Sequence, residues 1–206
     1  MKLITIFLML LFATSSYAEN KNEDNLTHFL DNMQTLQANF KQTLIDDQGM
    51  ELESFSGVVF LKRPNKFRWD YKHPYQQTIV TNGEVLWFYD EDLEQVTIRE
   101  VSSSVESTPV VILGSYEDIE KQFIIIDMEN IEGFDWVELT PRDIDSQYNS
   151  IRLGFNREKL GMMLMFDNLG QVTRIDFTEE VINKTLDNGT FDFESPEGVD
   201  VVDGRG

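Results

Sequence analysis

Residues 57–71 read GVVFLKRPNKFRWDY, and their pattern decides the fold class. Phe67, Trp69 and Tyr71 alternate with charged residues, so in an extended chain the aromatic side chains lie on one side and the charges on the other. This alternation is typical of a β-strand with one buried face and one solvated face. Residues 55–61, just upstream, also alternate and carry apolar side chains on both faces. The stretch therefore predicts two strands of a sheet.

The sequence downstream continues as strands joined by tight turns. Asn82-Gly83 predicts a hairpin between residues 78–80 and 85–89, with both turn residues at positive φ. About ten strands in sequence favour one antiparallel sheet that curls into a barrel or a sandwich. The other strands are expected at residues 95–99, 123–128, 134–140, 150–155, 160–166, 172–177, 181–186 and 190–193.

Two segments predict helices, which makes the fold class α+β. Residues 25–36 place an apolar stripe on one helical face, formed by Leu26, Phe29, Leu30, Met33 and Leu36. The second helix begins at Ser107 or Thr108, with Pro109 in its first turn, and runs through apolar residues to Leu113. Such a short helix has little polar face, so it is expected to act as a lid over a curved sheet. Residues 116–122 add one or two further turns.

The first eighteen residues have the three parts of a secretory signal peptide. Lys2 precedes an apolar run over residues 3–13, and a small-x-small ending follows at Ser16-Tyr17-Ala18. A membrane anchor is the alternative, but the run is shorter than the ~20 apolar residues that span a bilayer. We expect cleavage after Ala18, which leaves residues 19–206 as one exported domain.

Composition excludes several classes of protein. The 37 acidic and 17 basic residues give a formal net charge of -20, which argues against nucleic-acid binding because that depends on basic residues. Hydrophobic residues make up 41% of the 206 residues, too many for a disordered acidic chain. The chain has no cysteine, so disulfides, thiolate nucleophiles and cysteine-based metal sites are excluded.

The sequence offers no set of residues for catalysis or metal binding. The only histidines are His28 and His73, and both are expected in solvent, so a hydrolase triad has no base. Residues 90–94 carry alternating carboxylates that suggest calcium, but they lack the glycine of an EF-hand loop. A solvated acidic rim is the better interpretation. We therefore expect no enzyme activity, cofactor or metal.

Some strands are apolar on both faces. Residues 162–166 read MMLMF, and the unbranched thioethers of Met163 and Met165 suit a surface that adapts to varied hydrophobic ligands. The alternative is a strand covered on both sides by other parts of the fold. On the ligand-binding interpretation, Trp69 and Trp87 belong to the same apolar lining.

The motif over residues 57–71 resembles the signature of the outer-membrane lipoprotein carrier protein family, LolA. The resemblance continues through Pro74, Ile79-Val80, Asn82-Gly83, residues 86–90 and Thr108-Pro109. It implies an unclosed β-barrel of about ten or eleven strands, a single curved antiparallel sheet covered by the N-terminal helix and the short lid around a hydrophobic cavity. The motif also implies that Arg63 latches the lid through hydrogen bonds to helix backbone. The expected cavity lining is Leu30, Met33, Phe67, Trp69, Trp87, Val110, Ile112, Leu113, Met163 and Met165.

The resemblance also implies partners. A LolA-type carrier accepts acylated lipoproteins from an inner-membrane ABC transporter, crosses the periplasm as a monomer and delivers them to an outer-membrane receptor of the LolB family. That receptor family shares the fold but is itself acylated on a cysteine, which this chain lacks. The alternative function is a periplasmic sensor of lipids or lipoproteins on the same fold, which binds without delivery.

Overall fold

The computed structural model describes residues 21–101 and 119–205, and within them the chain forms one twelve-stranded sheet. The strand order is β12-β6-β5-β4-β3-β2-β1-β11-β10-β9-β8-β7. The bounds are β1 Thr35–Ile45, β2 Glu51–Lys62, β3 Lys66–His73, β4 Gln77–Thr81, β5 Val85–Asp90, β6 Gln95–Glu100, β7 Phe123–Asp127, β8 Asp135–Pro141, β9 Tyr148–Asn156, β10 Lys159–Asp167, β11 Val172–Ile182 and β12 Asp200–Asp203.

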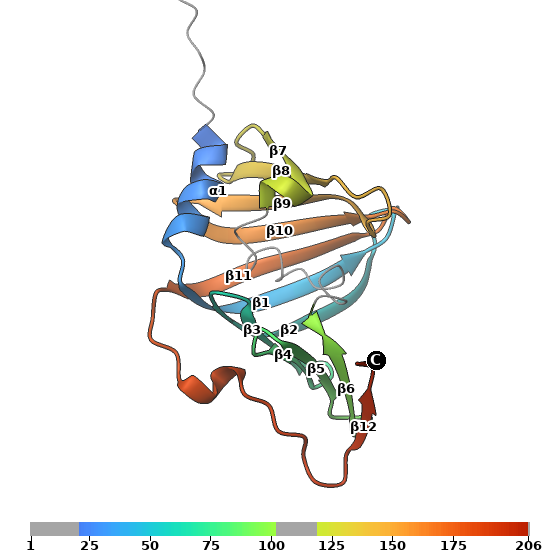
Figure 1. Cartoon of the computed structure of the whole chain (residues 1–206). Helices are drawn as coiled ribbons and strands as arrows, with labels where there is room; N and C mark the ends of the chain where they lie inside the picture. The colour runs from blue at the N-terminus through green and yellow to red at the C-terminus, as the bar shows by residue number, and fades with distance from the viewer. Residues whose placement is uncertain (1–20, 102–118, 206) are drawn as a thin grey trace, which may run out of the picture.

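The sheet is strongly curved but not closed. Figure 1 shows β7 and β12 at opposite ends of the sheet. Every neighbouring pair is antiparallel except β12 and β6, which run parallel. The unclosed antiparallel sheet confirms the predicted fold class, although the strand number is twelve rather than ten or eleven.

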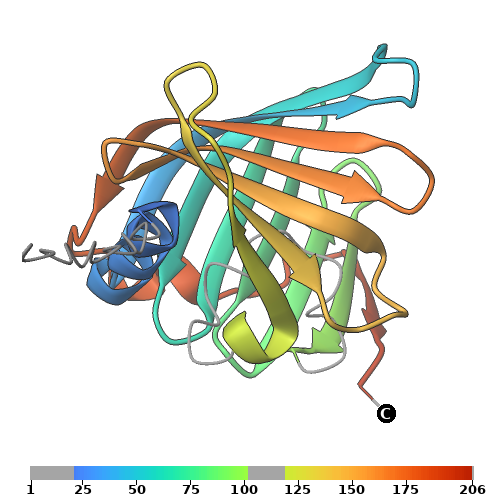
Figure 2. The same ribbon diagram turned by 90° about the horizontal axis from the view of Figure 1, so that it is seen from above.

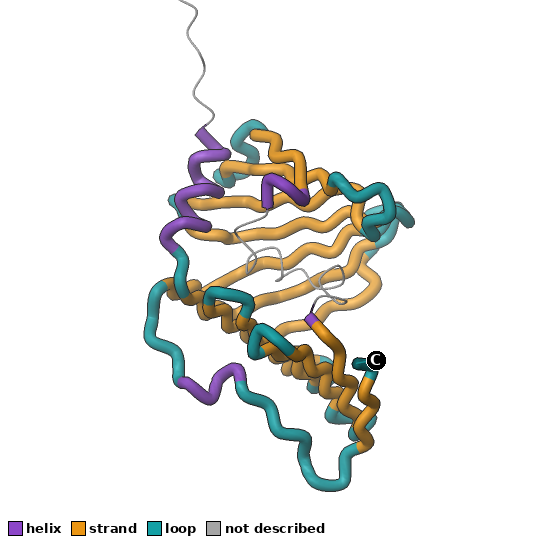
Figure 3. Tube along the Cα trace, in the orientation of Figure 1, coloured by secondary structure: helices purple, strands orange, loops and turns teal. Residues whose placement is uncertain are grey.

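Helices are few, and α1 (Lys21–Asn32) is the longest in the described residues (Figure 3). It packs against β7 and β8, and Figure 2 shows the sheet curving around α1 and the short helix α3 (Ile119–Gln122). We call the face of the sheet on this side the inner face and the opposite face the outer face. None of the helices in residues 21–101 and 119–205 is long and apolar enough to cross a bilayer.

The predicted helix over residues 25–36 extends beyond the C-terminal end of the observed helix. The helix stops at Asn32, and Leu36 lies in β1. The side chain of Asn183 fixes the boundary, because its amide donates to the Asn32 carbonyl at 2.8 Å and its oxygen accepts from the Gln34 N–H at 2.8 Å. Leu36 was expected to be buried as part of a helical stripe. It is buried, because alternation along β1 places its side chain on the inner face.

The hairpin at Asn82-Gly83 forms, but with three loop residues and a different backbone. Only Gly83 has a positive φ, of 101°. The Asn82 side chain accepts the backbone N–H groups of Glu84 and Val85 at 3.0 and 3.1 Å. The side chain of Asn82 therefore stabilises the turn, and a second left-handed residue is not needed.

The strands predicted at residues 150–155, 160–166 and 172–177 form, but the chain after β11 departs from the prediction. Residues 181–186 and 190–193 are not two further strands, because β11 ends at Ile182 and residues 183–199 run outside the sheet (Figure 1). The 3-10 helix η4 (Asn188–Phe191) lies near β3, and Phe191 is buried. We call residues 183–199 the C-terminal strap. The strap leads into β12, a strand that the sequence analysis missed because all four of its residues are exposed.

Candidate functional site

The inner face carries a continuous apolar surface. Trp69 is 1% exposed and packs against the tilted ring of Phe40, with ring centroids 4.4 Å apart, and makes an edge contact with Phe177 at 6.4 Å. Phe67 is 4% exposed on the same strand, β3. These side chains share one face because residues two apart in a strand point the same way.

Helix α1 covers one end of this face. Its stripe residues Leu26, Phe29 and Leu30 are buried, as is Met33 just after its end, and the Phe29 ring lies 5.5 Å from the ring of Phe155 on β9. They join one apolar cluster with Phe67 and Trp69. The helix therefore contributes the same kind of surface as the strands beneath it.

Arg63 connects the loop between β2 and β3 to α1. Its Nη1 donates a hydrogen bond to the carbonyl of Leu30 in the last turn of the helix, and its backbone N–H donates to the Gln34 carbonyl at 2.9 Å. The last carbonyls of a helix lack partners within the helix, so a guanidinium there supplies a missing donor and a favourable charge. The structure thus places the Arg63 guanidinium against the last turn of α1, while the predicted lid at residues 107–113 lies outside the described residues.

Strand β10 contributes two methionine side chains to the inner face. Met163 and Met165 are fully buried on the inner face, beside Ile175 of β11 and residues of β9. The intervening Leu164 and the flanking Phe166 face outward, where the Arg152 guanidinium lies 4.6 Å from the Phe166 ring centre. The structure fits a strand covered on both sides, since its inner face is buried and its outer face is half-buried, and ligand binding by the thioethers stays a prediction.

Trp87 does not belong to this lining. Leu86 and Phe88 of β5 face the apolar cluster, so the intervening Trp87 faces outward, where it lies 6.1 Å from Phe193 of the C-terminal strap. The sequence analysis misplaced it because both faces of β5 carry aromatic residues. Val110, Ile112 and Leu113 lie outside the described residues.

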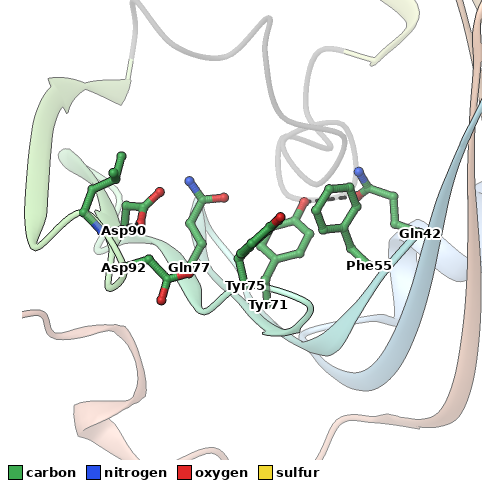
Figure 4. Close-up of a pocket in the computed structure, with 8 residues that line it drawn as sticks. Gln42, Phe55, Tyr71, Tyr75, Gln77, Asp90 and Asp92 are labelled. Carbon is green, nitrogen blue, oxygen red and sulfur yellow. Dashed lines mark hydrogen bonds between the residues drawn. The ribbon is translucent and has the colours of Figure 1, made fainter. Parts of the chain in front are cut away.

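A pocket of about 440 Å³ opens where β1, β2, β3, β4 and β5 end (Figure 4). We call it the mouth pocket. Its size is within the range of small-molecule sites. The described residues that line it are Gln42, Phe55, Tyr71, Tyr75, Gln77, Asp90, Asp92 and Leu93.

Tyr71 lies at the boundary between the mouth pocket and the apolar inner face. Its ring makes edge contacts with Phe40 at 5.2 Å and Phe55 at 5.8 Å, and its hydroxyl donates to Gln42 Oε1 at 3.0 Å. Burial raises the pKa of Tyr71 to about 12, so the hydroxyl remains a neutral donor over the physiological range.

The sequence analysis did not assign the mouth pocket. Tyr71 was detectable, because strand alternation puts it on the same face as Phe67 and Trp69. Gln42, Tyr75 and Gln77 carry no comparable signal, since they meet only where the ends of separate strands come together. Of the solvated acidic rim expected at residues 90–94, residues 91–94 are exposed, whereas Asp90 is half-buried and lines the pocket.

The titratable groups form no metal centre in the described part of the chain. No group of three or more His, Asp or Glu side chains there has the geometry to hold an ion. His28 and His73 are exposed, and the His28 Nε2 lies 3.5 Å from the Glu158 Oε2 at the protein surface. The chemistry that this site offers is apolar contact with a polar edge.

The fold and site together define a class of protein, the unclosed β-barrels with an apolar inner face partly covered by helix. Residues 31–194 match the family described as outer membrane lipoprotein carrier protein LolA. The chain belongs to this outer-membrane lipoprotein carrier family.

Similar proteins agree with this assignment. The outer-membrane lipoprotein carrier protein of Methylococcus capsulatus is 40% identical over 96% of this chain and 95% of its own length. The protein of the same name from Nitrosospira multiformis is 38% identical over 98% of this chain and 97% of its own. A LolA superfamily protein from Nitrosomonas europaea has a similar structure, with a TM-score of 0.50, 14% identity and coverage of 82% of this chain and 96% of that one. The last likeness shows a shared fold.

Proposed function

We propose that this protein carries acylated lipoproteins across the periplasm. It accepts them from an inner-membrane ABC transporter, covers their acyl chains and delivers them to an outer-membrane receptor of the LolB family. The observation that carries this proposal is the apolar cluster that joins the inner face to the end of α1, with Phe67, Trp69, Met163 and Met165 from the sheet and Leu30 and Met33 from the helix end. The names of the relatives support lipoproteins as cargo.

A carrier of this kind answers an energetic problem. Moving an acyl chain from membrane to water costs ~0.8 kcal/mol per CH₂, so one long chain costs roughly 10 kcal/mol. An apolar face inside an exported protein removes most of that cost. In this proposal residues 1–18 direct export, and the carrier acts as a monomer without catalysis.

The direct test compares acylated and de-acylated forms of one lipoprotein. We expect a soluble complex with the acylated form only, followed by transfer when vesicles bearing the receptor are added. Gel filtration measures the complex and vesicle flotation measures the transfer. Equal binding of both forms would refute acyl recognition, binding without transfer would favour the sensor function, and cleavage of an ester would indicate an enzyme.

Arg63→Leu is expected to leave loading intact and to impair transfer. In the empty carrier the Arg63 guanidinium holds the Leu30 carbonyl of α1, and acyl chains compete with α1 for the inner face. Hydrogen bonds to charged groups contribute about 1.5–3 kcal/mol, so losing this one should favour the loaded state by about 10- to 100-fold.

The control is Arg174→Leu, which removes an exposed arginine paired with Asp176 on β11 at 2.7 Å. Flotation assays on both variants measure the fraction of lipoprotein transferred. Wild-type transfer by the Arg63→Leu protein would contradict the role given to Arg63.

A further inference from the structure

The mouth pocket differs in chemistry from the apolar face beside it. Its described lining combines aromatic side chains with the amides of Gln42 and Gln77, the hydroxyls of Tyr71 and Tyr75, and two carboxylates. None of its described lining residues is Lys or Arg. A site of this kind suits a neutral polar group attached to a hydrophobic one.

Tyr71 sets where the polar end of a ligand would lie. Its ring contacts Phe40, which belongs to the apolar cluster, while its hydroxyl bonds to Gln42 in the mouth pocket. Hydrocarbon that entered the apolar cluster at Phe40 and Trp69 would therefore end beside this hydroxyl and amide. The Tyr71 hydroxyl gives its single proton to Gln42 Oε1 and so orients this amide. The NH₂ group of an amide donates hydrogen bonds to the carbonyl oxygens of esters and amides.

The acidic side chains at the pocket edge disfavour an anionic ligand. Asp90 and Asp92 both line the pocket, and the Asp90 Oδ1 accepts the Leu93 N–H at 3.0 Å, which fixes that carboxylate at the edge. Glu91 and Glu94 lie in the same turn and add to the negative potential. Like charges brought close together in a partly buried site repel each other strongly.

We propose that the mouth pocket binds the neutral ester or amide linkage of an acylated ligand, while Asp90 and Asp92 exclude anionic phospholipid headgroups. This inference rests on the proposed function and deepens it, since it names the part of the cargo that lies at the mouth. It also predicts that anionic membrane lipids are poor ligands: their acyl chains would suit the inner face, but an anionic headgroup would meet the carboxylates of Asp90 and Asp92.

The test compares three probes with identical acyl chains: a diacylglyceryl peptide, diacylglycerol and phosphatidylglycerol. Displacement of a fluorescent hydrophobic dye measures the affinity of each. We expect the wild-type protein to bind both neutral probes about tenfold more tightly than phosphatidylglycerol. In the double variant Asp90→Asn/Asp92→Asn, we expect tighter phosphatidylglycerol binding, with the difference reduced to about threefold or less.

The control is Glu129→Gln/Glu132→Gln, which removes two exposed charges from the turn between β7 and β8 and should keep the wild-type preference. A double variant at Asp90 and Asp92 that keeps the tenfold preference would overturn the inference, as would a wild type that binds all three probes equally. If the diacylglyceryl peptide bound and diacylglycerol did not, the pocket would recognise the polypeptide rather than the linkage, and this result would also overturn the inference. If the wild type binds none of the three, the proposed function itself fails.

A second variant tests the donors. Tyr71→Phe keeps the ring that packs on Phe40 and removes the hydroxyl that donates to Gln42 Oε1. Because this hydrogen bond orients the Gln42 amide whose NH₂ donates to the ester, affinity for diacylglycerol should fall about three- to tenfold. Affinity for the dye, which has no ester, should not change. Unchanged diacylglycerol affinity would contradict the assignment of Tyr71 to the linkage.

Discussion

Gly57→Ala should lower the free energy of unfolding by more than about 3 kcal/mol, because there is no space for a side chain at this position. A Cβ atom on Gly57 would lie 1.8 Å from the Asp70 carbonyl oxygen and 2.9 Å from the Phe40 ring. The carbonyl belongs to the neighbouring strand β3, so it cannot move without disturbing the β2–β3 pairing. Urea unfolding followed by circular dichroism measures the loss.

Ser56→Ala is the matched control for this prediction. Ser56 precedes Gly57 in β2 and is only partly buried, and its replacement adds no atom beyond Cβ. We expect a change within about 0.5 kcal/mol. If Gly57→Ala were as stable as Ser56→Ala, the close approach of β2 to β3 would be refuted.

Phe67→Glu should abolish lipoprotein loading and strongly destabilise the fold. Phe67 is 4% exposed within the apolar cluster, so glutamate there loses the packing of the ring and buries a carboxyl group without a designed partner. Truncating a buried Phe alone costs about 3–5 kcal/mol, and an unpaired buried polar group adds to that. Gel filtration with acylated lipoprotein measures loading, and thermal unfolding measures stability.

Two further variants separate loading from folding. Lys66→Gln makes the same change in net charge one residue away, outside the apolar cluster, and should load normally. Phe67→Leu keeps an apolar side chain, so it should fold and retain loading at reduced yield. Recovery of a loaded Phe67→Glu complex at wild-type yield would exclude Phe67 from the lining.

The alternation of apolar and polar residues predicted a strand and its buried face correctly where only one face of the strand is apolar. The alternation of Phe67, Trp69 and Tyr71 correctly predicted both β3 and the face that it buries. The same reasoning misplaced Trp87, because β5 has aromatic residues on both faces and only the packing of Phe193 distinguishes them. It also extended α1 to Leu36, because the side chain that ends the helix, Asn183, lies 151 residues away from Asn32.

The sequence by itself determined the class of fold, the family and the residue types of the apolar face, because alternation of side chains and a contiguous motif are properties of neighbouring residues. Only the tertiary structure decided which apolar faces meet, where Arg63 and Asn183 bind α1, and that the C-terminal strap pairs β12 in parallel with β6. It alone assembled the mouth pocket, from strand ends that lie far apart in the chain. The physical reason is that contacts between distant residues depend on strand register and sheet curvature, which the whole sheet sets together.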